Sequence, residues 1–487
     1  MAVLTVPALR GRALLLAAAM ASASGANAED LRGALNQAYQ TNPSLQAARA
    51  QQRATDEGVP IARASGLPSL SGSAAETEFL KQNGSSTTSV DQSLSAGLSL
   101  GVPLYAGGAV RNSIRAAETR VEAGQADLRG IETGVFNQVV AAYMDVILSE
   151  AVVGLNRNTV EVLEVNLQAT RDRFEIGDLT RTDVAQSQAR LSLAKGDLRS
   201  AQSNLIGARE RYIQVIGKVP GDLEPPPPLP GLPGSPQEAV EVALDSNPDL
   251  IAAKFRKEAA RRDVQVAGAA RLPKVSVFSG VDYVDYLGSL KSATLPPGSL
   301  AQNQTTAQAG IRATIPLFQG GLPAARERQA QAVENALIEQ EIAAEREVIS
   351  QTRAAYATWQ AANEIIESTQ TAVDAATLSL EGVRAENSVG NRTILDILDA
   401  ERELLQTKVR LVTARRNAYV AGFSLLAAMG KAEAQDLGLD GGPLYDPDVN
   451  YQRVRGKWFD WDRDPAPVAR STRTVDTPAQ DGSSLTK

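Results

Sequence analysis

The chain of 487 residues contains no cysteine and no histidine. The lack of cysteine excludes thiol nucleophiles, disulfides and a lipid anchor on an N-terminal cysteine, and the lack of histidine excludes imidazole bases. Most zinc sites need one of these two residues, so we expect neither a metal centre nor a cofactor. Aromatic residues make up only 4% of the chain, which argues against a thick hydrophobic core.

The chain also lacks an excess of positive charge, since its formal net charge is −7. Proteins that bind nucleic acid usually carry a basic patch. No glycine-rich phosphate loop of the G-x-x-x-x-G-K-[ST] type occurs in the sequence either. We therefore expect no nucleic-acid partner.

An apolar segment stands at the N-terminus. Two arginines precede it, it covers residues 13–23, and the tripeptide Ala-Asn-Ala follows at residues 26–28. This pattern predicts a secretory signal peptide over residues 1–28 and a mature chain that begins at Glu29. A helix that spans a bilayer needs about 20 apolar residues, and we find no later segment apolar enough over that length. A membrane location would then require a β-barrel.

The mature sequence repeats itself. The pair Asn42-Pro43 recurs as Asn247-Pro248, at an offset of 205 residues. The motif Leu-Tyr-Ala-Gly-Gly at residues 104–108 recurs as Leu-Phe-Gln-Gly-Gly at residues 317–321, at an offset of 213. Matches that stay in register over such distances indicate a tandem duplication.

The duplication divides the chain into two structural repeats, residues 29–217 and 237–430. The linker at residues 218–236 contains four consecutive prolines, which favour a stiff extended segment. The C-terminal tail at residues 431–487 is polar. Its last part, from residue 470 onward, is rich in Thr, Ser, Asp and Gly, and this composition predicts disorder.

Each repeat contains two segments in which apolar and polar residues alternate. The clearest segment runs from Val90 to Leu104, and the second repeat has the same pattern from Ala307 to Leu317. This alternation is typical of a strand with one apolar and one polar face. We expect four strands paired as two hairpins, at about residues 67–79, 89–105, 272–286 and 305–318.

For one such strand alone, a soluble sandwich or a surface hairpin is the ordinary explanation. Strands of 12–15 residues exceed the usual length of about 5–6 and suit a tilted membrane crossing. Four strands are half of the roughly eight that a closed transmembrane barrel needs, and an open edge is not tolerated in lipid. Three copies supply twelve strands and no edge, so strands that lie in lipid predict a homotrimer.

Two stretches of more than 110 residues lack proline, one between Pro103 and Pro220 and one between Pro323 and Pro443. Both are rich in good helix formers, and one glycine breaks each of them. The first helix of each pair would reach on the order of 100 Å, far longer than a globular core needs. We expect antiparallel coiled-coil helices at about residues 109–173, 178–217, 322–386 and 391–430.

These features together resemble the TolC family of outer-membrane efflux and secretion ducts. The resemblance is carried by the duplicated Asn-Pro pairs, the two strand-to-helix turns and two helix-hairpin motifs. The motifs are RFEIGDLTRTDV at residues 173–184 and SVGNRTILDILDA at residues 388–400. The resemblance covers residues from about 30 to 430, and the second motif is quite specific.

The resemblance implies a mixed α/β fold. Four strands per protomer would form a twelve-stranded outer-membrane barrel, and the helices would form a periplasmic tunnel. It also implies a bacterial, exported and non-lipidated exit duct of a tripartite efflux pump or type I secretion system. The implied partners are a periplasmic adaptor (membrane fusion) protein and an inner-membrane pump of the RND, ABC or MFS type.

The resemblance also assigns roles to single residues. By position, Asp183 matches the acidic partner in the latch that closes the family's periplasmic aperture, and Arg392 matches the cationic partner. A compared family member carries tyrosine where this chain has Asn387, so the aromatic part of the latch is absent or replaced. Asp396 and Asp399 match the carboxylates that line the constriction. The hairpin tips within reach of an adaptor are Gly177, Gly390, Arg181 and Asn391.

Physical reasoning supports a pore role for Asp396 and Asp399. Residues three apart on a helix share one face, about 5–6 Å from each other. Three copies would gather six carboxylates around one axis, and such a ring should repel anions and bind divalent cations that block the pore. The ordinary alternatives are a solvated helix face for the aspartates, a surface ion pair for the latch and simple helix termination for the two glycines.

Three other functions explain parts of the sequence. A periplasmic adaptor or scaffold built on an α-helical hairpin accounts for the helices and the signal peptide, but not for two pairs of long amphipathic strands. A general diffusion porin needs many more strands per chain and little helix. An enzyme would have only Asp and Glu as acid and base, and no α/β pocket pattern surrounds them.

Overall fold

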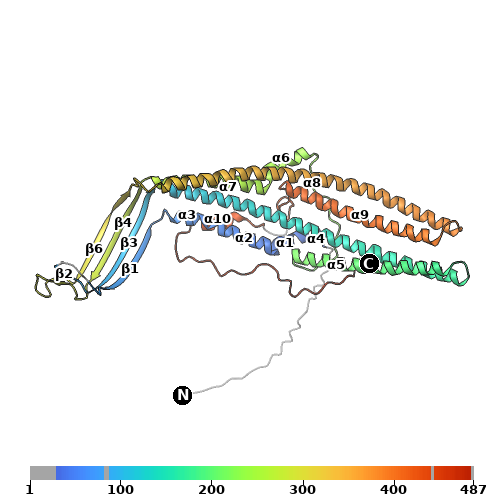
Figure 1. Cartoon of the computed structure of the whole chain (residues 1–487), viewed down its shortest axis with the longest axis horizontal. Helices are drawn as coiled ribbons and strands as arrows, with labels where there is room; N and C mark the ends of the chain where they lie inside the picture. Colours follow the sequence, from blue (N-terminus) through green and yellow to red (C-terminus); the bar gives the residue numbers. More distant parts are fainter. Residues whose placement is uncertain (1–28, 82–86, 440–443, 484–487) are drawn as a thin grey trace, which may run out of the picture.

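The computed structural model describes residues 29–81, 87–439 and 444–483. The molecule is elongated, with a sheet at one end and two long helical hairpins that run away from it (Figure 1). The predicted signal peptide lies outside the described residues.

The sheet contains four long antiparallel strands in the order β1-β3-β4-β6. They are β1 (Ser69–Glu78), β3 (Gln92–Ala106), β4 (Lys274–Asp285) and β6 (Asn303–Thr314). β1 pairs with β3 and β4 pairs with β6 as two hairpins, and the β3–β4 pairing joins the two repeats. Two short strands, β2 (Thr88–Ser89) and β5 (Lys291–Ser292), pair across the loops at the far end.

One face of the sheet is apolar and is not covered by any described part of the chain. The register places Leu98 opposite Val281 and Val281 opposite Ala307, so alternate residues of three strands share this face. Leu98 and Val281 are exposed, and Ile311 farther along β6 is 71% exposed. Apolar surface in water costs about 25 cal/mol per Å², so this face needs an apolar environment such as lipid.

Each repeat continues from its second long strand into a long helical hairpin. The hairpins are α4 (Ala109–Glu175) with α5 (Arg181–Ile216), and α8 (Leu322–Ser388) with α9 (Ile394–Ala428). α4 and α8 contain 67 residues each, which corresponds to about 100 Å. Gly108 and Gly321 precede them with φ of 82° and 80°. Glycine adopts this left-handed conformation without a steric penalty, so both strand-to-helix turns depend on it.

Short helices that the sequence analysis did not anticipate precede the strands in each repeat. They are α1 (Leu31–Thr41), α2 (Pro43–Asp56) and α3 (Gly58–Ala64) before β1, and α6 (Pro236–Ser246), α7 (Pro248–Gly268) and the 3-10 turn η1 (Ala269–Arg271) before β4. The Asn42 side chain accepts a hydrogen bond from the Ser44 backbone N–H and donates one to the Val215 carbonyl. Asn247 caps α7 in the same way and donates to the Ala428 carbonyl. The repeated Asn-Pro pairs therefore tie the short helices to the end of each long hairpin.

The main hydrophobic core lies along the middle of α4, where Phe136, Val139, Tyr143 and Val146 are fully buried. α4 also contains an 18-residue window that is long and apolar enough to cross a bilayer by composition. Our expectation that no segment after the signal peptide has this property was therefore wrong. Nearly half of the window is buried within the chain, so packing against neighbouring helices accounts for its apolar composition.

The two hairpins bury their apolar side chains to different degrees. Among the four long helices α4 has the largest number of buried residues, 22, whereas α8 has seven. Val333, Ile365 and Leu378 of α8 are exposed along its length. Because monomeric proteins rarely expose extended apolar surfaces, α8 is suited to contact with another polypeptide.

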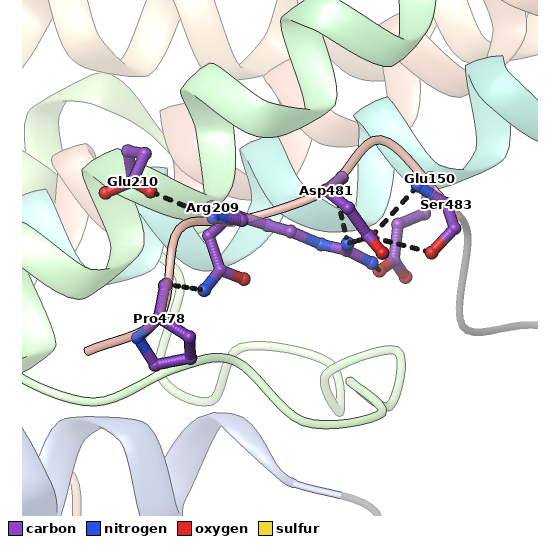
Figure 2. Close-up of polar contacts among 7 residues, drawn as sticks. Glu150, Arg209, Glu210, Pro478, Asp481 and Ser483 are labelled. Atoms are coloured by element: carbon purple, nitrogen blue, oxygen red, sulfur yellow. Dashed lines mark hydrogen bonds and ion pairs between the residues drawn. The ribbon is translucent and has the colours of Figure 1, made fainter.

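The C-terminal tail contains α10 (Pro447–Val454), and the chain after this helix runs back along the helical part (Figure 1). Figure 2 shows its last described residues, where Asp481 meets Arg209 of α5. The Arg209 guanidinium donates to the Asp481 carbonyl at 2.9 Å and pairs with Glu150 of α4 at 2.9 Å. The side chains of Arg209 and Glu150 are only 4% and 8% exposed. Composition predicts disorder from residue 470, whereas in the structure the described part of this segment is anchored on a buried ion pair.

Candidate gate at the helix tips

Both helical hairpins turn at the end of the molecule farthest from the sheet (Figure 1). The turns contain Gly177 and Gly390, whose φ values are 89° and 83°. In the first turn the Asp178 N–H donates to the Arg173 carbonyl, and Asn391 makes the equivalent bond in the second turn. These bonds satisfy carbonyls at the helix end, so both glycines serve as helix terminators.

The tips are open to solvent. The four predicted docking residues are all exposed: Gly177, Gly390, Arg181 and Asn391. Ile176 and Val389, which precede the two glycines, are exposed apolar residues at equivalent positions. The sequence analysis did not single them out, although the offset of 213 residues relates them. Each tip therefore presents one branched apolar side chain next to polar groups.

A capping box starts the second helix of each hairpin. In α5 the Thr180 hydroxyl accepts from the Asp183 N–H at 3.3 Å, and the Asp183 carboxylate accepts from the Thr180 N–H at 2.8 Å. Thr393 and Asp396 make the same two bonds in α9, at 3.4 and 2.8 Å. Asp183 and Asp396, to which the resemblance gives different roles, therefore occupy equivalent positions.

These hydrogen bonds also change the acidity of both carboxyl groups. The backbone N–H and the hydroxyl of Thr180 hold the pKa of Asp183 below its usual value. The hydroxyl and the backbone N–H of Thr393 lower the pKa of Asp396 in the same way. Both donors stabilise the ionised form, so the two tips carry negative charge at neutral pH.

Asp399 lies one turn beyond Asp396 and binds arginine side chains. Its carboxylate pairs with Arg190 of α5 at 2.9 Å and with Arg402 of α9 at 3.3 Å. The pair with Arg190 connects the two hairpins of one chain. The Asp399 side chain is still half exposed, so it remains accessible to ions in solution.

Arg392 binds within its own turn. Its Nε donates to Glu386 at 2.7 Å, and its Nη1 lies 3.9 Å from the Asp396 carboxylate. The hydrogen bond that Arg392 donates to Glu386 and the charges of both carboxylates raise the pKa of Arg392. The Asn387 amide donates to the Arg392 carbonyl at 2.7 Å, which closes the turn. Among the described residues Asp183 forms no ion pair with Arg392.

Several residues of this site were not predicted from the sequence. Thr180 and Thr393 had a readable signal, because Thr-x-x-Asp before a helix is a capping pattern. Arg190 and Glu386 had no signal in the sequence. Arg190 binds Asp399 of the other hairpin, and Glu386 binds Arg392 across a turn.

Comparison with known proteins relates these features to one family. A family model described as outer membrane efflux protein matches residues 34–218 and 239–431. The chain belongs to the outer membrane efflux protein family. The two matched segments coincide with the two structural repeats, so the family pattern covers both hairpins and both pairs of strands.

Relatives and solved structures of this family resemble the whole chain. Outer membrane efflux protein BepC of Brucella suis is 33% identical over 450 residues, which cover 92% of this chain and 95% of BepC. Outer membrane protein TolC of Escherichia coli is 26% identical and covers 84% of each protein. The structure of the Campylobacter jejuni CmeC outer membrane channel has a TM-score of 0.72 at 16% identity, covering 88% of this chain and 89% of that one.

The comparisons confirm the TolC-like α/β fold and the outer-membrane location expected from the sequence. The protein is an outer-membrane efflux channel with a helical part in the periplasm. Its relatives are channel proteins and not enzymes. The alternative of a hairpin adaptor without a pore is not supported by these relatives.

Proposed function

We propose that this efflux channel works as a homotrimer whose twelve strands close one barrel. The observation that carries the proposal is the open sheet, in which β1 and β6 are edge strands and one face is apolar and exposed. In lipid each unpaired backbone group costs several kcal/mol, so both edges must find partners. Pairing of β1 in one copy with β6 in the next satisfies both edges.

The helical part supports the same assembly. The exposed apolar residues of α8 lie on a hairpin that runs beside the first hairpin of its own chain. A neighbouring copy would cover them, as happens at the seams of coiled coils. Three pairs of hairpins would then enclose a water-filled tunnel, which agrees with the polar side chains on the remaining faces.

Convergence of the tips would form the periplasmic gate. Asp396 and Asp399 of three copies would place six carboxylates around the axis, where they attract cations and repel anions. Asp183 and Arg392 of neighbouring copies would act as a latch. To form it, Arg392 would release its ion-pair partner Glu386 and pair with Asp183 instead. Asn387 would support the turn that presents Arg392, in place of an aromatic contact.

The exposed tips are also the proposed docking site for a periplasmic adaptor. Ile176 and Val389 would supply apolar contacts, and the glycines beside them would allow close approach of the partner's backbone. The nearby Arg181 would add a polar contact. An inner-membrane pump of the RND, ABC or MFS type would deliver the cargo, and we assign the choice of cargo to pump and adaptor because a polar duct is generic.

The oligomeric state in detergent tests this proposal. Treatment of the purified protein with an amine-reactive cross-linker should give a ladder that ends at three chains. A ladder that ends at two chains, or a monomer soluble without detergent, would contradict the proposal. Conductance of the trimer in planar bilayers then distinguishes a pore from a hairpin scaffold without one.

A further inference from the structure

An exposed aromatic cluster follows α10 within the C-terminal tail. Trp458, Phe459 and Trp461 are 76%, 63% and 75% exposed. The chain has only three tryptophans, so two of them stand on the surface within four residues. Aromatic side chains each bury roughly 150–250 Å² when covered. Three exposed aromatic side chains so close together are therefore suited to bind a partner. We name residues 455–464 the aromatic loop.

The aromatic loop is held in shape by ion pairs at its base. Arg453 donates to both carboxylate oxygens of Asp464, at 2.7 and 2.8 Å. Lys457 pairs with Asp462 at 3.0 Å and with Asp464 at 3.6 Å. The Asp462 N–H closes the turn on the Phe459 carbonyl at 3.2 Å. With these four charged side chains paired at the base, the loop leaves its rings exposed to solvent.

The position of α10 brings the aromatic loop close to the sheet. α10 begins beside Gln125 of α4, which donates to Asp448 at 2.8 Å, and it ends beside α3, where Arg63 donates to the Arg455 carbonyl at 3.3 Å. At 1.5 Å per residue, Gln125 lies about 24 Å from the start of α4 at Ala109. α10 contains eight residues and runs back toward the start of α4 over about 12 Å. The aromatic loop thus begins roughly 12 Å from the strand-to-helix turns.

Those turns end the strands whose exposed apolar face needs lipid, so we infer that the boundary between membrane and periplasm lies there. Tyr105 and Phe318 are exposed there, at the ends of the two strands that lead into the long helices. The headgroup layer adds roughly 5–8 Å on each side of the hydrocarbon core. Chain beyond Arg455 advances up to about 3.5 Å per residue, so the rings of the aromatic loop can reach this layer.

We propose that Trp458, Phe459 and Trp461 form an interfacial anchor in the periplasmic phospholipid leaflet of the outer membrane. Tryptophan prefers the headgroup level, where its ring is apolar and its N–H finds a hydrogen-bond partner. Arg455 and Arg463 flank the rings and supply charges that attract phosphate groups. The anchor lies outside the barrel strands and adds a second contact between the periplasmic part and the membrane.

A phospholipid surface explains the loop better than a second protein does. Charged residues lie all around the rings: Asp462 and Asp464 pair with cations at the base, Asp460 stands between the rings, and two arginines flank them. A protein interface usually has few charged residues at its centre. The aromatic loop also begins within roughly 12 Å, along the helix axis, of the turns where Tyr105 and Phe318 are exposed.

Tryptophan fluorescence in lipid vesicles tests the anchor on the full-length channel. The third tryptophan, Trp359, is half-buried on α8 against Tyr356. It lies about 55 Å from the start of that helix, far from any lipid. A Trp359→Phe variant therefore reports only on the aromatic loop. A Trp458→Phe, Trp461→Phe variant reports only on Trp359 and serves as the matched control.

Both variants are inserted into vesicles of phosphatidylcholine and phosphatidylglycerol, with or without bromine on the acyl chains near the carbonyl, and insertion is verified by potassium conductance. We expect bromine to quench the emission of the Trp359→Phe protein and to leave the control unchanged. Equal emission of the Trp359→Phe protein in both kinds of vesicle would overturn the anchor. Emission that is shifted to the blue without quenching would also overturn it, because it would show that a protein surface covers the rings.

Discussion

Arg190 of α5 pairs with Asp399 of α9 at 2.9 Å and so connects the two hairpins of one chain close to their tips. The two residues are 209 positions apart in the sequence. The same carboxylate is a candidate for the ring that binds cations. The Asp399 side chain therefore contributes both to the charge of the gate and to the contact between the hairpins.

Replacement of Arg190 by alanine should loosen the gate. An exposed ion pair is worth about 0.2–1 kcal/mol, so we expect the open probability in planar bilayers to rise by up to about fivefold. Lys195→Ala is the control, because Lys195 pairs with Glu164 at 2.7 Å within a single hairpin. Equal open probabilities of Arg190→Ala and the wild type would remove this pair from the gating mechanism.

Neutralisation of the proposed carboxylate ring should abolish the block by divalent cations. Asp396→Asn combined with Asp399→Asn removes all six charges in a trimer, so the attraction for divalent cations is lost. Asp396 also caps α9, and this loss could disturb the tip by itself. Asp183→Asn removes the equivalent cap from α5 and controls for that effect. Persistent block in the double variant, measured as single-channel conductance against added magnesium, would exclude the ring.

The capping aspartates predict a pH range for the stability of the tips. Since the folded-state pKa of Asp183 and of Asp396 lies below the value in an unfolded chain, about 3.9, their contribution is complete above that value. It is lost as the pH falls further through the folded-state pKa. Protection factors for hydrogen exchange at the starts of α5 and α9 should therefore stay constant down to about pH 4 and then fall. A decline between pH 7 and 5 would contradict this assignment.

The ion pair beneath the tail should matter more than the tail residue that covers it. Arg209→Ala leaves the Glu150 carboxylate buried without its partner, which costs about 3–5 kcal/mol. We expect a clear drop in the midpoint of thermal unfolding. Asp481→Ala removes a side chain that is largely exposed and should cost less than about 1 kcal/mol. Addition of Glu150→Gln to Arg209→Ala should recover part of the loss, and similar midpoints for all three variants would refute a structural role of the pair.

Patterns in the sequence predicted the elements that depend on neighbours along the chain. The alternation from Val90 to Leu104 predicted a strand because side chains alternate between the faces of a sheet. Gly177 and Gly390 marked the hairpin turns because few other residues adopt positive φ at low cost. The short helices could have been found as well, since Asn42-Pro43 and Asn247-Pro248 combine a favoured N-cap residue with proline at the first helical position.

The sequence by itself thus determined the duplication, the long helices, the strands with one apolar face and the capped tips. These features follow from hydrogen bonds and side-chain periodicities within a few residues. Only the tertiary structure decided that Arg190 meets Asp399, that Arg209 holds the tail, and that α10 carries three aromatic rings toward the sheet. Such pairs join residues that are far apart in the chain. Their partners depend on how entire helices pack, and no local pattern records that packing.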